Sequence, residues 1–389
     1  MADLATLDRS GPIVQAGTVS VANLNSVDPC ADPTLSSSGR WSVAFPEQWW
    51  YPACASHELG RNPHPITLMD QPLVLFRDAH GTPHALIDRC PHRNVPLSLG
   101  RVQADGTLQC GYHGWRFDGA GRCTAVPALD VSLANGGTPR DVPARPVREQ
   151  DGFVWVWGST EVAPSRAPFA LPQLGSGSTV GEVVFRRDME CTVHASVENA
   201  LDVPHTAFLH GGLFRKTGQG PLVQAERTDL NDGVEVRYVG EPAAFGPLRL
   251  PGDATFDHWD RFFLPSIAQV EYRIGDAVRI TNSILHLPLS ATRTRAWFVL
   301  RFRSPLPASV IGPIVRARGK KILQQDVDML EHQTRNIRRF GGERYASTDL
   351  DLLGNAIWRL MRQAEKADRN EQETQLDIRV GNPKATLQL

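Results

Sequence analysis

The chain has 389 residues, enough at ~150 residues per domain for two or three domains with more than one hydrophobic core. Its 41 Lys and Arg residues balance 42 Asp and Glu residues, and this formal net charge of -1 argues against a general basic field that would hold nucleic acid. Hydrophobic residues make up 41% of the chain, too many for a disordered protein, while apolar runs such as 72–76 are far shorter than the ~20 residues of a membrane helix.

The N-terminal residues and the cysteines bear on the cellular compartment. Asp3, Asp8 and Arg9 interrupt the small residues at the start, and no basic segment followed by an apolar core indicates a secretory signal. We therefore expect a cytoplasmic protein with no nucleic-acid partner and no membrane span. In such a protein the six cysteines are thiols or metal ligands rather than disulfides.

Composition and periodicity divide the chain into segments. Residues 1–40 are rich in Ser, Asp, Ala and Gly and predict a flexible N-terminal arm. Short β-type runs separated by turn signals predict a small antiparallel β domain over residues 41–163. Residues 164–181, rich first in Pro and then in Gly and Ser, are typical of a linker.

Longer elements follow the linker. Strand-like runs and three segments with helical spacing, at 192–201, 313–337 and 352–368, predict an α+β domain over residues 182–375, with one antiparallel sheet flanked by helices. Residues 376–389 are expected to be a C-terminal tail. The predicted fold class is therefore a small antiparallel β domain followed by an α+β domain.

The β domain contains two Cys and two His residues with the spacing of metal ligands. Cys90 and His92 form one pair, and Cys110 and His113 form a second pair after seventeen intervening residues. A structural zinc site also accepts two Cys and two His, but usual zinc spacing pairs like with like. Here each loop offers one Cys and one His, which suits a two-iron, two-sulfur cluster with both thiolates on one iron and both imidazoles on the other.

The segments 90–93 and 110–115 resemble the Rieske domain of Rieske non-haem iron oxygenases. The resemblance implies a 2Fe-2S cluster with Cys90 and Cys110 on the inner iron and His92 and His113 on the solvent-side iron. It also implies an α+β catalytic domain of the helix-grip, START-like type. Within the family, the length and single-chain pattern resemble the homotrimeric phthalate dioxygenase and vanillate demethylase type, with some likeness to pheophorbide-type oxygenases.

The second domain contains two further histidines close to carboxylates. His205 and His210 are five residues apart, a separation of ~140° on a continuous helix, so the helix must distort between them to bring both to one metal. Pro204 offers the physical reason, because it cannot donate a backbone hydrogen bond. Two imidazoles and one carboxylate leave positions on Fe(II) open for O2 and substrate.

The carboxylate ligand must come from a later segment, where residues 325–333 present several candidates. Resemblance to the late motif of the family, an Asp followed by Glu and Gln, selects Asp326, with Asp328 as the second candidate. In the family, a carboxylate matching Asp202 joins the cluster of one subunit to the iron of its neighbour, which implies a homotrimer. Glu198 and Asn199 are candidates to support the iron ligands from outside.

The chain lacks a dinucleotide-binding pattern, since the Gly-rich stretch 175–181 has the wrong spacing and does not join a strand to a helix. Electrons from NAD(P)H must then arrive through a separate reductase, directly or through a ferredoxin. The predicted function is a terminal oxygenase that hydroxylates or oxidatively dealkylates a small organic substrate, as a mono- or dioxygenase. The alternatives are a Rieske electron carrier or binding protein, and a zinc-stabilised interaction protein.

Aromatic residues predict a bulky apolar or aromatic substrate. Phe245, Phe256, Trp259, Phe262 and Phe263 fall in the segments 245–263 and 280–286 that we expect to line the pocket, although core packing explains them equally well. Among the remaining histidines, His258 and His286 are candidates for pocket residues.

Overall fold

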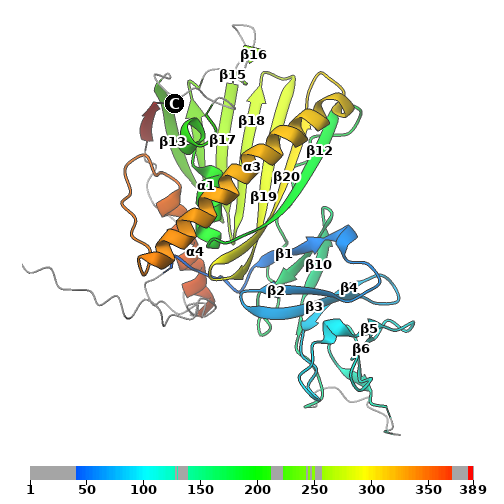
Figure 1. Cartoon of the computed structure of the whole chain (residues 1–389). Helices are drawn as coiled ribbons and strands as arrows, with labels where there is room; N and C mark the ends of the chain where they lie inside the picture. Colours follow the sequence, from blue (N-terminus) through cyan, green and yellow to red (C-terminus); the bar gives the residue numbers. More distant parts are fainter. Residues whose placement is uncertain are drawn as a thin grey trace, which may run out of the picture. The chain divides into compact units, whose positions relative to one another are not determined.

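A computed structural model of the protein describes residues 41–127, 129, 139–211, 222–241, 244–245, 248–249, 256–369 and 384–388 (Figure 1). The predicted N-terminal arm lies outside the described residues, as does most of the predicted C-terminal tail. None of the described helices is long and apolar enough to cross a membrane.

The first half of the chain forms three small antiparallel sheets, as predicted. Short strands follow one another closely because turn residues with positive φ, such as Gly81 and Gly106, reverse the chain between them. The sheets are β1-β11-β10, β2-β3-β4-β9 and β5-β6-β7-β8. The elements are β1 (Trp50–Ala55), η2 (Ser56–Glu58), β2 (His64–Leu68), β3 (Gln71–Arg77), β4 (Pro83–Ile87), η3 (Leu97–Leu99), β5 (Arg101–Val102), β6 (Leu108–Gln109), β7 (Arg116–Phe117), β8 (Cys123–Ala125), β9 (Ala144–Arg145), β10 (Val147–Gln150) and β11 (Phe153–Trp157).

Strand β3 explains how these small sheets are held together. Its four central side chains are all fully buried, because alternate residues point into two different cores. Leu73 and Leu75 belong to the larger core, whereas Val74 and Phe76 belong to a smaller core that also contains Cys90. The thiols proposed as cluster ligands are thus anchored in an apolar interior.

The second half is dominated by one antiparallel sheet of eight strands in the order β12-β20-β19-β18-β17-β14-β13-β21. Its members are β12 (Val180–Met189), β13 (Leu222–Leu230), β14 (Gly233–Val239), β17 (Phe256–Phe263), β18 (Ile267–Ile274), β19 (Val278–Ser290), β20 (Arg293–Arg303) and β21 (Lys384–Gln388). A separate short pair joins β15 (Ala244–Phe245) to β16 (Leu248–Arg249). Strand β21 was not predicted and pairs with β13.

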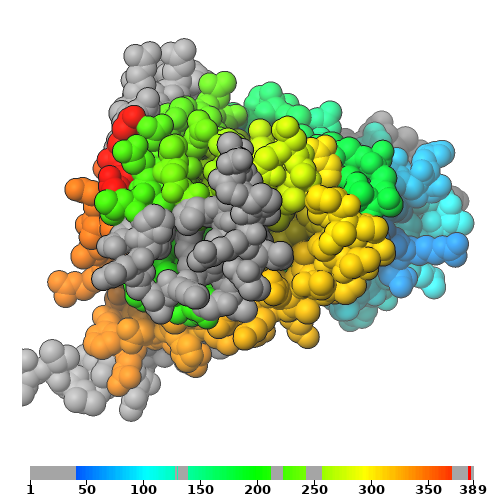
Figure 2. Space-filling model, turned by 90° about the horizontal axis from the view of Figure 1, so that it is seen from above, coloured from blue at the N-terminus to red at the C-terminus, as the bar shows by residue number. Residues whose placement is uncertain are grey.

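Helices cover one face of this sheet. They are α1 (Val193–Leu201), α2 (His205–Phe208), α3 (Ala308–Arg339) and α4 (Gly354–Arg369). Helix α1 contacts strands β17 to β20, and α3 crosses the sheet and contacts β12 (Figure 1). Figure 2 looks at the domain from above and shows the strands in green and yellow beside α3 in gold. The α+β fold class predicted from the sequence is confirmed.

Register separates the two faces of the sheet. Phe185 on β12 lies under α3, where a Cβ atom on Gly319 would approach its ring to 3.1 Å. The row that continues from Phe185 across the sheet, Phe298, Ile284, Ala268, Phe262 and Val234, therefore belongs to the helix-facing surface. Side chains at positions offset by one residue form the outward surface.

Candidate active site

The structure brings His205, His210 and Asp326 together under the helix layer. Ligand atoms of these three side chains all lie within 4.8 Å of one another, a spacing that fits one metal ion. His210 Nε2 is 3.0 Å from Asp326 Oδ1, and His205 Nε2 is 3.6 Å from the same oxygen. The carboxylate of Asp326 comes from the long helix α3.

The helix breaks before His205, whereas the sequence predicted that Pro204 would distort it between His205 and His210. Helix α1 ends at Leu201, and Asp202 forms its C-cap in an extended conformation. Pro204 then starts the four-residue helix α2, and His210 follows after α2 has ended. Leu209 caps α2 in a helical conformation and its N–H donates to His205 O, so the helix ends between the two histidines only after Leu209.

The electrostatics of the three side chains suit a cation. Burial opposes a charge on His205, but the Asp202 and Asp326 carboxylates outweigh it and raise the pKa of His205 to about 9. Burial likewise opposes ionisation of Asp326, and the two imidazoles lower its pKa. Asp326 Oδ1 faces both imidazoles, so the site offers a carboxylate oxygen to a positive charge. These residues fit a mononuclear iron with two imidazoles and one carboxylate.

A partner fixes the orientation of His210. Its Nδ1 atom is 3.0 Å from Gln325 Oε1, so Nδ1 donates to the amide and Nε2 is left facing Asp326. Sequence reasoning did not identify Gln325. No signal in the sequence identified it, because its role depends on the contact between His210 and α3.

Other candidate residues occupy different positions. Asp328 is exposed on α3 and accepts a hydrogen bond from Gln324. Glu198 lies against Gly354, and burial together with Asp202 raises the pKa of Glu198 to about 7. Asn199 contributes its backbone carbonyl, which accepts from Asp202 N–H at 3.4 Å. Within the described residues, neither Glu198 nor Asn199 has a side-chain hydrogen bond to the three clustered residues.

The two Cys/His loops repeat the same backbone arrangement. Cys90 N–H donates to the carbonyl five residues later, and Asn94 N–H donates back to Cys90. Cys110 and Gly114 make the equivalent two bonds in the second loop. Asn94 and Gly114 both have positive φ, 61° and 74°, which tightens each loop. Each loop can therefore present one thiol and one imidazole in the same way.

Burial distinguishes the thiols from the imidazoles. Cys90 and Cys110 are buried, His92 is half-buried and His113 is exposed. The two imidazole rings lie 4.5 Å apart between centroids, and Trp115 stacks on His92 at 4.8 Å. Burial raises the pKa of Cys90 to about 11, whereas the backbone amides of His92 and Arg93 oppose this rise. The four residues fit a cluster with an inner sulfur-bound iron and an outer iron bound by imidazoles.

The aromatic residues expected to line a pocket divide between the two faces of the sheet. Phe262 is fully buried on the helix-facing surface. Trp259 lies on the outward surface, where Arg237, Arg261 and Arg273 surround its ring, so its predicted role in the lining is wrong. Phe263 shares the outward register with Trp259, and the side chain of Phe245 lies outside what the structure describes. Alternation along β17 causes this division.

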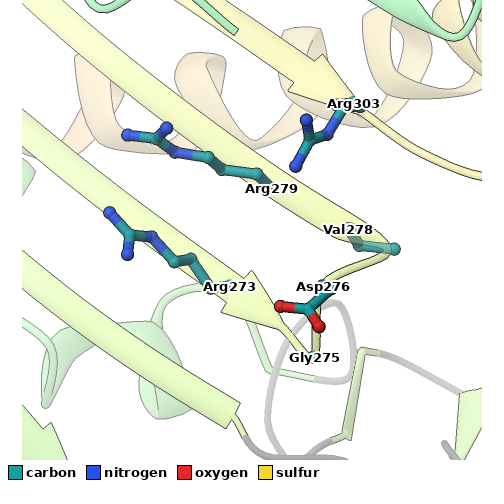
Figure 3. A pocket seen from close by; sticks show the side chains of 6 residues that line it. All are labelled: Arg273, Gly275, Asp276, Val278, Arg279 and Arg303. Carbon is teal, nitrogen blue, oxygen red and sulfur yellow. The ribbon is translucent and has the colours of Figure 1, made fainter.

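A pocket on the outward surface is also distinct from the clustered ligands. Glu271 accepts hydrogen bonds from Arg273 and Arg279 there, at 2.7 and 2.9 Å. The residues that line the pocket are Arg273, Gly275, Asp276, Val278, Arg279 and Arg303 (Figure 3). Since Glu271 alternates with residues of the helix-facing surface, this pocket opens away from His205 and His210.

Comparisons with known proteins match both halves of the chain. The family model of the Rieske [2Fe-2S] domain matches residues 49–139. The model of the vanillate O-demethylase oxygenase C-terminal domain matches residues 189–367. A crystal structure of dicamba monooxygenase bound to dicamba has a TM-score of 0.68 at 21% identity and covers 84% of this chain and 99% of that chain, which shows a shared fold.

Curated relatives are oxygenases. The chain is 32% identical to a 4beta-methylsterol monooxygenase of Methylococcus capsulatus over 67% of this chain and 70% of that protein. It is 26% identical to a vanillate O-demethylase oxygenase subunit of Pseudomonas sp. over 80% of this chain and 92% of that protein. A pheophorbide a oxygenase of Oryza sativa is 35% identical over 46% of this chain, a match that spans 35% of that protein. The chain belongs to the Rieske non-haem iron oxygenases, whose oxygenase components use a Rieske 2Fe-2S cluster, a mononuclear iron and O2.

Proposed function

We propose that this chain is the terminal oxygenase of a system that inserts oxygen from O2 into a small organic substrate. Cys90, Cys110, His92 and His113 would hold the cluster, and His205, His210 and Asp326 would hold the mononuclear iron. The convergence of the last three residues carries the proposal, because a Rieske electron carrier has no need of a second metal site.

The reaction needs more electrons than the substrate gives. Hydroxylating one C–H bond with O2 requires two electrons and two protons, and yields the alcohol and water. When bound, the cluster and the iron supply these electrons and the position at which O2 is reduced. Hydroxylation of a carbon bonded to oxygen or nitrogen would end in loss of the alkyl group, and the names of the demethylase relatives favour this outcome.

Asp202 is the proposed link between the two metal sites. Its carboxylate lies 3.5 Å from His205 Nδ1, and its side chain is 41% exposed. A carboxylate in this position can orient the imidazole of His205 with one oxygen and accept from an outside donor with the other. The family resemblance makes that donor a cluster histidine of a neighbouring subunit.

Exposed apolar side chains support a homotrimer in which the cluster of one subunit approaches the iron of the next. Phe208, between the two iron histidines, is 80% exposed. Tyr112 and Leu99, at the Cys/His loops, are 63% and 75% exposed. Large exposed apolar side chains beside both metal sites are typical of surfaces that become covered on association.

The system also requires an electron donor. Oxygenase components of this family receive electrons from a reductase, and we propose that a ferredoxin can stand between the reductase and this chain. The cytoplasmic location expected from the sequence stays a prediction.

The substrate is proposed to have a bulky apolar or aromatic body. Val270, Ile280, Phe298 and Leu300 all belong to the helix-facing surface and keep partial exposure, so they offer apolar contact area in the domain that holds the iron ligands.

The test combines the purified chain with a surrogate reductase, NADH and isotopically labelled dioxygen. A panel of aromatic methyl ethers and methyl-substituted ring compounds is screened by mass spectrometry for labelled products. We expect the wild type and His332→Ala, an exposed control on α3, to form the same product, whereas His210→Ala keeps the cluster spectrum and forms none. Turnover by His210→Ala, or a wild type that reduces its cluster yet labels no compound, contradicts the proposal.

A further inference from the structure

A buried polar group lies on the helix-facing surface, on strands that the proposed iron site does not use. His258 on β17 is fully buried, and its two ring nitrogens lie 2.8 Å from Glu241 Oε2 and 3.0 Å from Asp260 Oδ1. Burial disfavours the charged ring, but the two carboxylates raise the pKa of His258 to about 9. His258 is therefore an imidazolium at neutral pH and donates from both nitrogens.

Two tyrosines hold the His258 ring from either side. The row Tyr238, His258 and Tyr272 runs across β14, β17 and β18. Tyr238 stacks on the imidazole at 4.5 Å and Tyr272 at 4.4 Å between ring centroids. The stacked rings fix the imidazolium, and the imidazolium in turn fixes one oxygen of Asp260.

Within the described part of the chain, no donor lies in hydrogen-bond geometry at the second oxygen of Asp260. Asp260 is 1% exposed, and its Oδ2 atom is buried without a hydrogen-bond donor. Asn282 Oδ1 is in the same situation. A buried acceptor without a donor costs about 1–3 kcal/mol, more when it is charged, so two of them on one surface require an explanation.

The two unpartnered acceptors share one row of the sheet. Asp260 pairs with Val270, and Val270 pairs with Asn282, so the acceptors flank Val270 at a backbone separation of about 10 Å. Val270 and Asn282 keep partial exposure, whereas in the next row Ala268 and Ile284 are almost completely buried. Val270 and Asn282 are therefore less completely covered than the residues of the next row.

This row belongs to the same compartment as the proposed iron site. Helix α1 packs on β17 and β18, the strands of Asp260 and Val270, and ends at Asp202 beside His205. Burial raises the pKa of Tyr238, as do the charge of Asp260, a side-chain hydrogen bond with Asp260 and the charge of Asp202. The carboxylate next to the iron ligands thus acts electrostatically on the row beside Asp260.

We propose that Asp260 and Asn282 bind a hydroxyl or amino group of the substrate, whose apolar body lies over Val270. This inference rests on the proposed function and names the substrate class. Asp260 Oδ2 and Asn282 Oδ1 can only accept, so an ammonium group can donate to both, whereas a hydroxyl has one hydrogen and donates to one of them. A carboxylate has no hydrogen to donate and satisfies neither. His258 and Glu241 position Asp260, and the substrate need not touch them.

The test measures binding of four compounds that share one ring and differ in one group. They are para-methoxybenzyl alcohol, para-methoxybenzylamine, para-methoxytoluene and para-methoxybenzoate, titrated anaerobically into the metal-loaded protein in a calorimeter. We expect the alcohol or the amine to bind at least about 10-fold more tightly than the toluene and the benzoate.

Three variants locate this preference. Asp260→Asn should weaken binding of the donor compound about 10- to 100-fold, as expected for a hydrogen bond to a charged group. Asn282→Leu should weaken it about 3- to 10-fold and leaves the His258 contacts in place. Thr281→Val is the matched control, because Thr281 Oγ1 is equally buried and unpartnered but lies on the outward surface.

The outcomes separate this inference from the proposed function. Any of three results overturns the inference. The benzoate binds most tightly, or all four compounds bind equally or not at all, or Asp260→Asn and Asn282→Leu both keep the wild-type preference. Iron content and the cluster spectrum are recorded for each variant. Loss of the donor preference with both metal centres intact supports the inference, whereas a wild type without mononuclear iron contradicts the proposed function whatever the compounds do.

Discussion

Asp202 illustrates how much depends on a single side chain. It ends α1, lies 3.5 Å from His205 Nδ1 and remains 41% exposed, although a carboxylate used only to orient an imidazole could be buried. Its exposure makes sense if the second oxygen receives a donor from another subunit.

Replacing Asp202 by Asn should separate metal binding from electron transfer. The amide keeps the size and some hydrogen bonding but loses the charge. We expect the cluster and the mononuclear iron to remain bound and dithionite to reduce the cluster, while single-turnover product formation falls by orders of magnitude. Asp328→Asn, on the exposed side of α3, is the control. Normal transfer in the Asp202 variant would remove this residue from the electron path.

The buried histidines His258 and His286 should affect stability in different ways. The pKa of His258 is raised to about 9 by Asp260 and Glu241, with Tyr238 and Tyr272 stacked on its ring. Its stabilising contribution is fully present below its unfolded pKa of ~6.5 and is lost as pH rises through about 9. Burial lowers the pKa of His286 to about 4, so His286 stays neutral over this range.

Urea denaturation between about pH 6 and pH 10 tests this difference. The free energy of unfolding of the wild type minus that of His258→Gln should fall as pH rises. The corresponding difference for His286→Gln should not change with pH. Parallel profiles for the two variants would show that His258 is not held as an imidazolium.

At the scale of elements, the short helix α1 positions Asp202. Thr192 is the N-cap of α1, and its Oγ1 accepts from Ala195 N–H at 3.0 Å. Thr192→Ala removes the cap and a methyl group, whereas Thr192→Ser removes the methyl group alone. We expect Thr192→Ala to be less stable than Thr192→Ser by about 1 kcal/mol in chemical denaturation. Equal stabilities would mean that the hydroxyl is not needed to begin the helix.

Much of the fold was predictable because its elements are locally encoded. The helical spacing of residues 313–337 predicted most of α3, whose buried residues Leu323, Val327, Leu330 and Thr334 form one stripe. Pro204 was expected to distort the helix between His205 and His210, but the break that it accompanies lies before His205. The four candidate cluster ligands could be selected from the sequence because two loops repeat one Cys and one His at short spacing.

The remaining parts depend on contacts between distant segments. Strand β17 was expected to contribute both Trp259 and His258 to a pocket, but register places His258 and Asp260 on the helix-facing surface and Trp259 on the outward surface. Asp260 and Asn282 lie in one row because each of them pairs with Val270 on the strand between them. Neither residue belongs to a sequence motif, so the sequence alone does not predict that they lie near each other. Gln325 became visible only once His210 was placed beside α3.

At the scale of the whole molecule, the proposed trimer makes each active site a product of two chains. Cys110→Ser should lose the cluster and Asp326→Ala the mononuclear iron, so each variant alone should be inactive. If the cluster of one subunit serves the iron of its neighbour, co-expressed and co-purified variants should regain part of the wild-type activity. Mixed trimers without activity would mean that electrons move within one chain.

The central claim, that one chain holds a Rieske cluster and a separate iron, is tested most directly by metal and sulfide analysis. The wild type should contain about three iron atoms and two acid-labile sulfides per chain. Cys110→Ser should retain about one iron and no sulfide, and His210→Ala should retain about two irons with both sulfides. Zinc in place of iron, or equal iron contents in the wild type and His210→Ala, would contradict the account.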